Sequence, residues 1–128
     1  MKIDLSQIAS YREESERHKA ALQRAKTGLE FCRLQMKQTK ESLARAKVSP
    51  LIKDIIKVMP NGSVEVMPAP GVIYVTAHLS QAEFVGVESF IVERFRLHDS
   101  HDFPCHTNYQ YRSPPGEFVV FHAVVRKF

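Results

Sequence analysis

The sequence predicts an α+β protein: a long N-terminal α-helix with coiled-coil spacing, followed by a small β-rich domain of mostly antiparallel strands. Residues 12–47 contain no proline and are rich in Ala, Leu, Lys, Arg, Gln and Glu, which favour helices. A seven-residue repeat runs through the same stretch. From Pro50 onward, Val, Ile, Phe, Tyr and Thr are interrupted by Pro and Gly, as in β-rich domains. We therefore expect a helical segment at 1–49 and a β-rich domain at 50–128.

Length and composition restrict the class of protein. The chain has 128 residues, of which 44% are hydrophobic and 25% charged, close to the average for globular proteins. No apolar run approaches the roughly 20 residues of a membrane helix, and the first residues do not resemble a secretory signal. We expect a cytoplasmic protein with no membrane partner and no cofactor. In a reducing compartment, Cys32 and Cys105 are expected to be buried free thiols.

The ends of the helix carry recognisable signals. Asp4 with Gln7 fits a capping box at the start, and Ser10 with Glu13 is a second candidate. Ser49 precedes a proline, and a residue before proline is disfavoured in the α region, so the helix is expected to end there.

Gly28 is the weak position within the predicted helix, because glycine costs about 1 kcal/mol relative to alanine and sometimes marks a hinge. Forty-odd helical residues span roughly 60 Å, whereas a compact 80-residue domain is about 30 Å across. An unbroken helix is therefore expected to extend beyond its own domain, where its apolar side chains need a partner.

The seven-residue repeat places apolar side chains along one line of the helix. The predicted helix–helix interface, which we call the apolar row, consists of Leu22, Leu29, Met36 and Leu43. The residues three positions later are mostly small, so a partner helix is able to approach closely. The sequence predicts a homo- or hetero-oligomer through this row without specifying the number or direction of the helices.

Basic residues recur at the same interval beside the apolar row. This basic row consists of Arg12, Lys19, Lys26, Arg33, Lys40 and Lys47. Residues 17–47 hold nine basic and two acidic side chains, whereas residues 49–128 hold seven basic and eight acidic ones. In a parallel homodimer only Glu14 would offer an acidic partner to the row, and an antiparallel pair would set like charges together. An acidic protein surface or a nucleic-acid backbone explains the row better, and a solvated helix face is the alternative.

The β-rich part is predicted as five or six mostly antiparallel strands forming a small sandwich or an open barrel. A proline-led turn at 59–62 separates two alternating apolar runs and predicts a hairpin. A helical turn at 80–84 followed by a strand at 88–97 is expected, with a helix over 80–97 as the alternative. The remaining strands are predicted at Val72–Leu79, Cys105–Arg112 and Glu117–Lys127.

Two groups of side chains in this part are candidate sites. Tyr74, Tyr109 and Tyr111 lie on predicted strands and form the candidate docking surface for a protein partner or for bases. A second group holds nitrogen and sulfur ligands of the kind that bind zinc: His98, His101, Cys105 and His106. Their spacing matches no standard zinc pattern, so a polar connecting loop is the favoured interpretation.

No phosphate-binding glycine loop, nucleophile elbow or zinc-protease motif is present. The sequence therefore favours a non-enzymatic interaction module, an accessory subunit or inhibitor of a larger complex that assembles through its helix and docks through its β-rich domain. The alternative is a nucleic-acid-binding protein that uses the basic row. A metal-dependent enzyme using the 98–106 cluster comes third.

Overall fold

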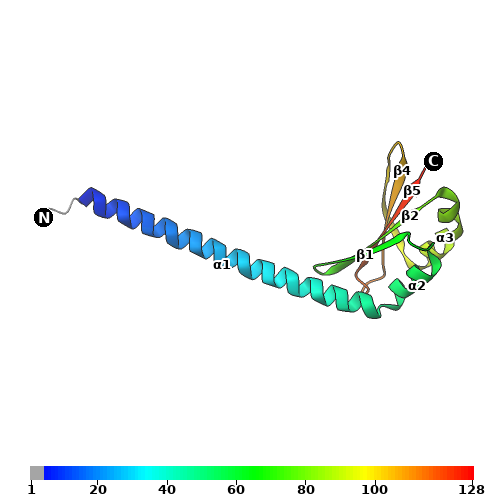
Figure 1. The fold of residues 1–128 in the computed structure, drawn as a ribbon, viewed down its shortest axis with the longest axis horizontal. Helices are drawn as coiled ribbons and strands as arrows, with labels where there is room; N and C mark the ends of the chain where they lie inside the picture. The colour runs from blue at the N-terminus through cyan, green and yellow to red at the C-terminus, as the bar shows by residue number, and fades with distance from the viewer. Residues whose placement is uncertain (1–4) are drawn as a thin grey trace. The chain divides into compact units, whose positions relative to one another are not determined.

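The computed structural model describes residues 5–128, and the chain divides into one unit within residues 1–36 and another of residues 37–128. The division falls inside the first helix, α1 (Leu5–Val48), which is one uninterrupted helix (Figure 1). The last three turns of α1 therefore belong to the unit that contains the sheet. The two units are described separately below.

Helix α1 confirms the long N-terminal helix predicted from composition. It passes through Gly28, the weak position of the predicted helix, without a break. Ser10 lies within the helix, and the capping box predicted at Ser10 and Glu13 is therefore wrong. The other predicted box includes Asp4, which lies outside the described residues. The positive charges of Arg45 and Lys47 in the last turn interact favourably with the negative end of the helix dipole.

The hairpin predicted around 59–62 is wrong, because its first arm belongs to a short helix, α2 (Pro50–Val58). Ser49 caps α2: its hydroxyl accepts a hydrogen bond from the Ile52 N–H at 3.4 Å. Proline at the first helical position suits this start, since its missing N–H would have no partner there. Leu51, Ile52 and Ile55 are buried at helical spacing, which outweighs the apparent alternation of the β-branched residues.

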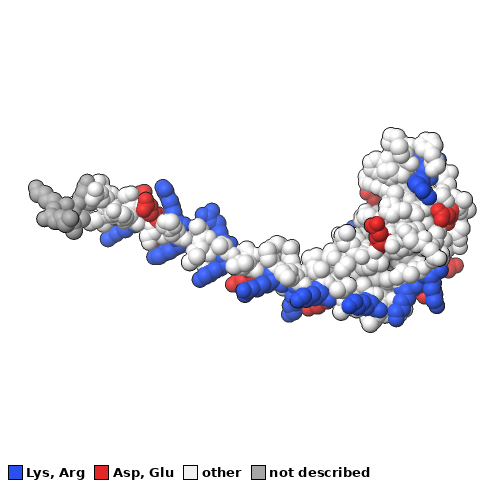
Figure 2. Space-filling model, viewed as in Figure 1, with Lys and Arg blue, Asp and Glu red and all other residues white. Residues whose placement is uncertain are grey.

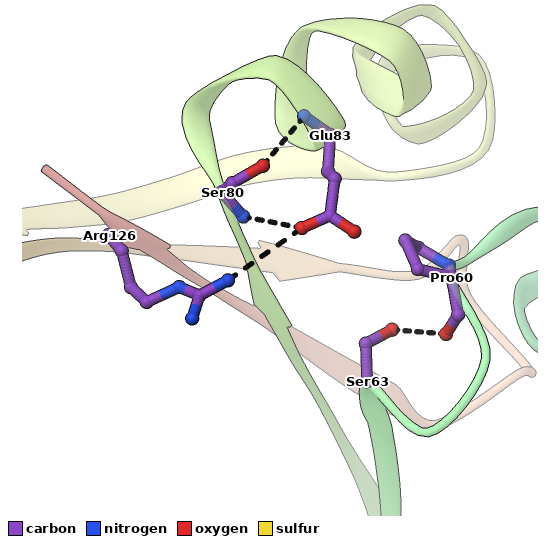
Figure 3. Close-up of polar contacts among 5 residues, drawn as sticks. All are labelled: Pro60, Ser63, Ser80, Glu83 and Arg126. Atoms are coloured by element: carbon purple, nitrogen blue, oxygen red, sulfur yellow. Dashed lines mark hydrogen bonds and ion pairs between the residues drawn. The ribbon is translucent and has the colours of Figure 1, made fainter. Parts of the chain in front are cut away.

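The strand predicted at 88–97 is also wrong, and the alternative helix is confirmed as α3 (Gln81–Arg94). Its N-terminus is a complete capping box (Figure 3). The Ser80 N–H donates to Glu83 Oε1 at 2.9 Å, and the Glu83 N–H donates to Ser80 Oγ at 3.2 Å. Hydrogen bonds to the Glu83 carboxylate from the backbone N–H and the side chain of Ser80 hold the pKa of Glu83 below its ordinary value, with a smaller contribution from the charge of Arg126, 3.8 Å from the carboxylate.

A single five-stranded sheet follows from the remaining segments. The strands are β1 (Val64–Ala69), β2 (Val72–Leu79), β3 (Arg96–Asp102), β4 (His106–Arg112) and β5 (Val119–Arg126). Their spatial order is β1-β2-β5-β4-β3; β2 and β5 are parallel and the other three pairs are antiparallel. The mostly antiparallel α+β class is thus confirmed, whereas the sandwich or barrel is wrong, because the described strands form one open sheet with β1 and β3 at its two edges. Proline within β1 is tolerated because β1 is an edge strand.

The core lies between the two short helices and one face of the sheet. Alternate residues of β2 and β5 are buried, and they form one cluster with buried residues of α2 and α3. At its centre the Phe121 ring lies 5.3 Å from the Phe95 ring and 6.1 Å from the Tyr111 ring, measured between centroids. The intervening residues of the same strands face away from this cluster. We call their side of the sheet the uncovered face.

Candidate interaction surfaces

The part of α1 at residues 5–36 is exposed along its whole length. No residue of this stretch is buried, and Leu22, Leu29 and Met36 of the apolar row are 59–61% exposed. A helix of this kind gains nothing from tertiary packing within its own unit, yet packing supplies most helical stability in proteins. The three side chains are available to a partner helix.

The apolar row changes character at its last member. Leu43 lies in the unit of residues 37–128 and is 42% exposed, while the neighbouring Ser42 is buried. One turn further on, Ala46 packs against the core, and the Arg45 guanidinium lies 5.0 Å from the centroid of the Phe118 ring. The end of α1 is therefore built into the sheet unit, and the fully free portion of the row is Leu22 to Met36.

The basic row forms no ion pair with the acidic side chains of the part of the chain that the structure describes. In Figure 2, Lys and Arg side chains recur along α1 with few acidic ones between them. Within residues 5–128, the four ion pairs all involve side chains between Asp54 and Lys127, and none includes a member of the basic row. Arg33, Lys37 and Lys40 follow one another at spacings of four and three, where like charges destabilise a helix. An acidic partner would relieve this repulsion.

The three tyrosines do not form the single docking surface that the sequence predicted. Tyr111 is buried in the core, and the Tyr109 ring stacks on Phe84 of α3 at 5.0 Å. Tyr74 faces the opposite side of the sheet, where it is 38% exposed. Strand alternation correctly placed Tyr109 and Tyr111 together, but that shared side is the buried one.

The uncovered face combines apolar and polar side chains. Tyr74 and Met67 are paired across β2 and β1, and the Tyr74 ring meets the His122 ring edge-on at 6.2 Å. Two enclosed polar atoms on this face, Asn108 Oδ1 and His122 Nε2, have no hydrogen-bond partner among the residues that the structure describes. Of the three predicted tyrosines, Tyr74 is the one presented for docking.

The candidate zinc ligands are not brought together. Nowhere in residues 5–128 do three His, Cys, Asp or Glu side chains converge as a metal site would require. His101 lies 3.0 Å from the Asp99 carboxylate, while the His106 ring stacks on Phe103 at 4.8 Å. His98 lies where the register shifts between Leu97 and Asp99. The polar connecting loop predicted for this segment is wrong in most of its length, because His98 and His101 lie on edge strand β3 and His106 begins β4.

Both cysteines are free, and both are exposed, so the expectation of buried thiols is wrong. Cys32 lies on the fully exposed part of α1, and Cys105 precedes β4. As for membranes, the described helices include none with the length and apolar character needed to cross a bilayer.

Sequence reasoning missed a group of arginines around the loop that joins β4 to β5. Arg96 and Arg112 are directly opposite each other on β3 and β4, and Arg45 contacts Phe118 of that loop. The only sequence signal was the outward position of Arg112 in the alternation of its strand. The opposition of the two arginines depends on strand register, which the sequence does not specify.

Comparison with protein-family models, with curated proteins and with solved structures gave no match for this chain. Function is therefore argued from the geometry and charge of these surfaces.

Proposed function

We propose that the chain is a non-enzymatic protein-interaction module, an accessory subunit or inhibitor of a larger complex, that assembles through α1. The observation that carries this proposal is the stretch of α1 at residues 5–36, where the apolar row is exposed and no residue is buried. Isolated helices depend on packing of an apolar face for most of their stability. A helix–helix partner would bury the row and supply that packing.

The charge beside the row indicates the kind of partner. Basic side chains flank the apolar row at every seventh position and have no ion pair in the described chain. A second copy would bring the same positive charge, so a homodimer would satisfy little of it. A helix with acidic residues flanking its own apolar row would match both features. Such complementarity acts mainly on association rate and specificity.

The sheet unit is the second contact of this proposed module. Tyr74 and Met67 offer an apolar centre on the uncovered face, and neither contributes to the core cluster. Two separate contacts in one chain strengthen binding through effective concentration even when each alone is weak.

Paired substitutions in α1 test the proposal. Leu22→Gln with Leu29→Gln removes two members of the row, and Phe31→Gln with Leu34→Gln is the matched control at equally exposed positions off the row. Burial of a leucine contributes about 1.5–3 kcal/mol, so each lost contact should weaken assembly about tenfold or more. The readouts are mass by light scattering and co-purification with partners from the native source.

The expected result is a loss of assembly or partner in the row variant and retention in the control, with helix content followed by circular dichroism. An unchanged mass and an unchanged partner set in the row variant would contradict the proposal. An equal loss of assembly in both variants would mean that exposed apolar side chains anywhere on the helix drive assembly, rather than the apolar row in particular.

The second candidate function is nucleic-acid binding through the basic row, favoured because none of those six side chains forms an ion pair within residues 5–128. Six phosphate contacts would give a slope of about −5 for log affinity against log salt on B-form DNA. Reversing Lys26, Arg33 and Lys40 to Glu should then remove at least half of that slope. Binding to random-sequence DNA or RNA that disappears in the reversal variant supports this candidate, whereas binding only to an acidic protein supports the first.

A further inference from the structure

The arginines of residues 37–128 fall into two groups. Arg94 pairs with Asp54 at 2.9 Å, and Arg126 approaches Glu83 at 3.8 Å. The other three, Arg45, Arg96 and Arg112, have no carboxylate partner anywhere in residues 5–128. All three line or flank hollows around the β4–β5 loop at residues 113–118.

Arg96 and Arg112 form the centre of this group. They are direct cross-strand partners on β3 and β4, on the uncovered face. Side chains in such pairs have Cβ atoms about 4.5–5.5 Å apart, and like charges placed this way are destabilising. Together with Leu97 and His98 they line a surface cleft of about 350 Å³. Two arginines lining one cleft offer several N–H donors of the kind that bind oxyanions.

An apolar hollow adjoins this cleft and shares Arg112 with it. The hollow measures about 240 Å³, and Val72, Phe118 and Val120 line it. The Arg45 guanidinium lies over the Phe118 ring, so a third positive charge flanks its rim. A ligand whose anionic group met Arg112 would therefore have an apolar surface directly beside that group.

The loop that shapes the hollow is held by backbone contacts. The Ser113 N–H donates to the Val119 carbonyl at 3.0 Å, and the Val119 N–H donates to Ser113 Oγ at 3.0 Å. Phe118 adopts a φ of 55°, a costly conformation for a bulky residue, and its carbonyl accepts from the Ile73 N–H at 2.9 Å. Strained residues fixed in this way cluster at binding sites.

Nearby carboxylates do not neutralise the pair. Asp99, on the same edge strand, is engaged by His101 at 3.0 Å. Glu93 lines a neighbouring cleft with Arg96 and Arg112 but forms no ion pair with either. The positive charge of the pair is thus available to a ligand.

We propose that Arg96 and Arg112 bind the phosphoryl group of a phosphate monoester, whose organic part occupies the hollow lined by Val72, Phe118 and Val120. Two guanidinium groups match the several oxygens of a phosphate, and the adjoining apolar hollow favours an aryl or alkyl substituent on it. No residue of the apolar or basic row of α1 is needed for this site, and its existence does not depend on the function proposed for those rows.

Titration of the full chain with inorganic phosphate and with phenyl phosphate, followed by backbone amide NMR shifts, tests the site. We expect saturable shifts at residues 96–98 and 112–120, with phenyl phosphate binding more tightly than inorganic phosphate. A charge-assisted hydrogen bond contributes about 1.5–3 kcal/mol, so Arg112→Gln should weaken binding by about tenfold or more. Arg126→Gln is the matched control, a strand arginine outside both hollows, and should bind like the parent.

Four results would overturn the proposal. Shifts that do not saturate, or an equal effect of Arg112→Gln and Arg126→Gln, would leave only general attraction of anions to a basic protein. If acetate bound as tightly as phosphate, the site would not be specific for a phosphoryl group. If phenyl phosphate bound no more tightly than inorganic phosphate, the apolar hollow would not be part of the binding site. Circular dichroism of each variant separates lost binding from lost folding.

Discussion

Residues 5–36 and residues 37–128 reach order by different physical routes. The first stretch is helical because its residues favour helix locally, and none of its side chains is buried. The second contains every buried hydrophobic residue of the described chain, contributed by two helices and a five-stranded sheet. Local propensity alone gives marginal stability in water, whereas burial gives a cooperative unit. The helix is therefore the part whose stability should respond to partners.

The largest expected difference between the regions comes from removing one side chain in each. Phe121→Ala deletes a fully buried ring and should cost about 3–5 kcal/mol in the free energy of unfolding of the sheet unit. Leu22→Ala, at an exposed position of α1, should change that same quantity by less than about 0.5 kcal/mol. Denaturant unfolding followed by near-ultraviolet circular dichroism measures both. Comparable losses would mean that the two regions unfold as one.

Truncation locates the boundary between the regions. A chain starting at Lys37 should keep the stability of the sheet unit, because Ser42, Arg45 and Ala46 remain in place. A chain starting at Pro50 loses these contacts and the Ser49 cap of α2, which alone is worth about 1 kcal/mol. Urea midpoints of the two fragments give the comparison. Equal midpoints would move the boundary to the position that the sequence predicted, at 49/50.

The capping box of α3 provides a smaller effect confined to the sheet unit. Ser80→Ala removes the hydroxyl that accepts from the Glu83 N–H and should cost about 1 kcal/mol. Ser89→Ala is the matched control, since Ser89 is exposed inside the same helix and should be neutral or slightly stabilising. Thermal unfolding of both variants measures the difference. If the control variant were as unstable as Ser80→Ala, the loss of stability would come from replacing a serine in this helix and not from the cap.

The smallest effect is a pH dependence from Glu83. Hydrogen bonds from the Ser80 N–H and hydroxyl lower the pKa of Glu83 from 4.5, so the folded chain takes up this proton at lower pH than the unfolded chain. Its stabilising contribution is complete above about pH 4.5 and disappears as pH falls through the lowered pKa. In Glu83→Gln, unfolding measured from neutral to acid pH should show a shallower acid decline. An unchanged acid profile would contradict this assignment.

The sequence was most informative where one signal dominated. The helix-forming composition of residues 12–47 predicted α1, and the run of strand-forming residues at Val72–Leu79 predicted β2. The hairpin predicted at 59–62 and the strand predicted at 88–97 were wrong for the same reason. Both predictions rested on β-branched residues that lie in short helices, where burial at helical spacing overrode strand propensity. In each case a serine cap was available as the stronger signal: Ser49 before a proline, and Ser80 with Glu83.

The candidate surfaces divided in the same way. The apolar and basic rows follow from helix geometry alone, so sequence spacing predicted their positions on α1. Alternation grouped Tyr109 with Tyr111 correctly but did not say which side of the sheet α3 would cover. The opposition of Arg96 and Arg112 depends on the pairing of two strands, information that no single segment contains.

The position of β5 affects how the protein is made. It is the last strand along the described chain, yet it lies in the middle of the sheet, between β2 and β4. Until Val119–Arg126 has been synthesised, β2 and β4 lack the strand that lies between them in the folded sheet, so each would present an unpaired edge. Unpaired edges of this kind favour aggregation, so β2 and β4 are most vulnerable during translation, until the final strand joins them.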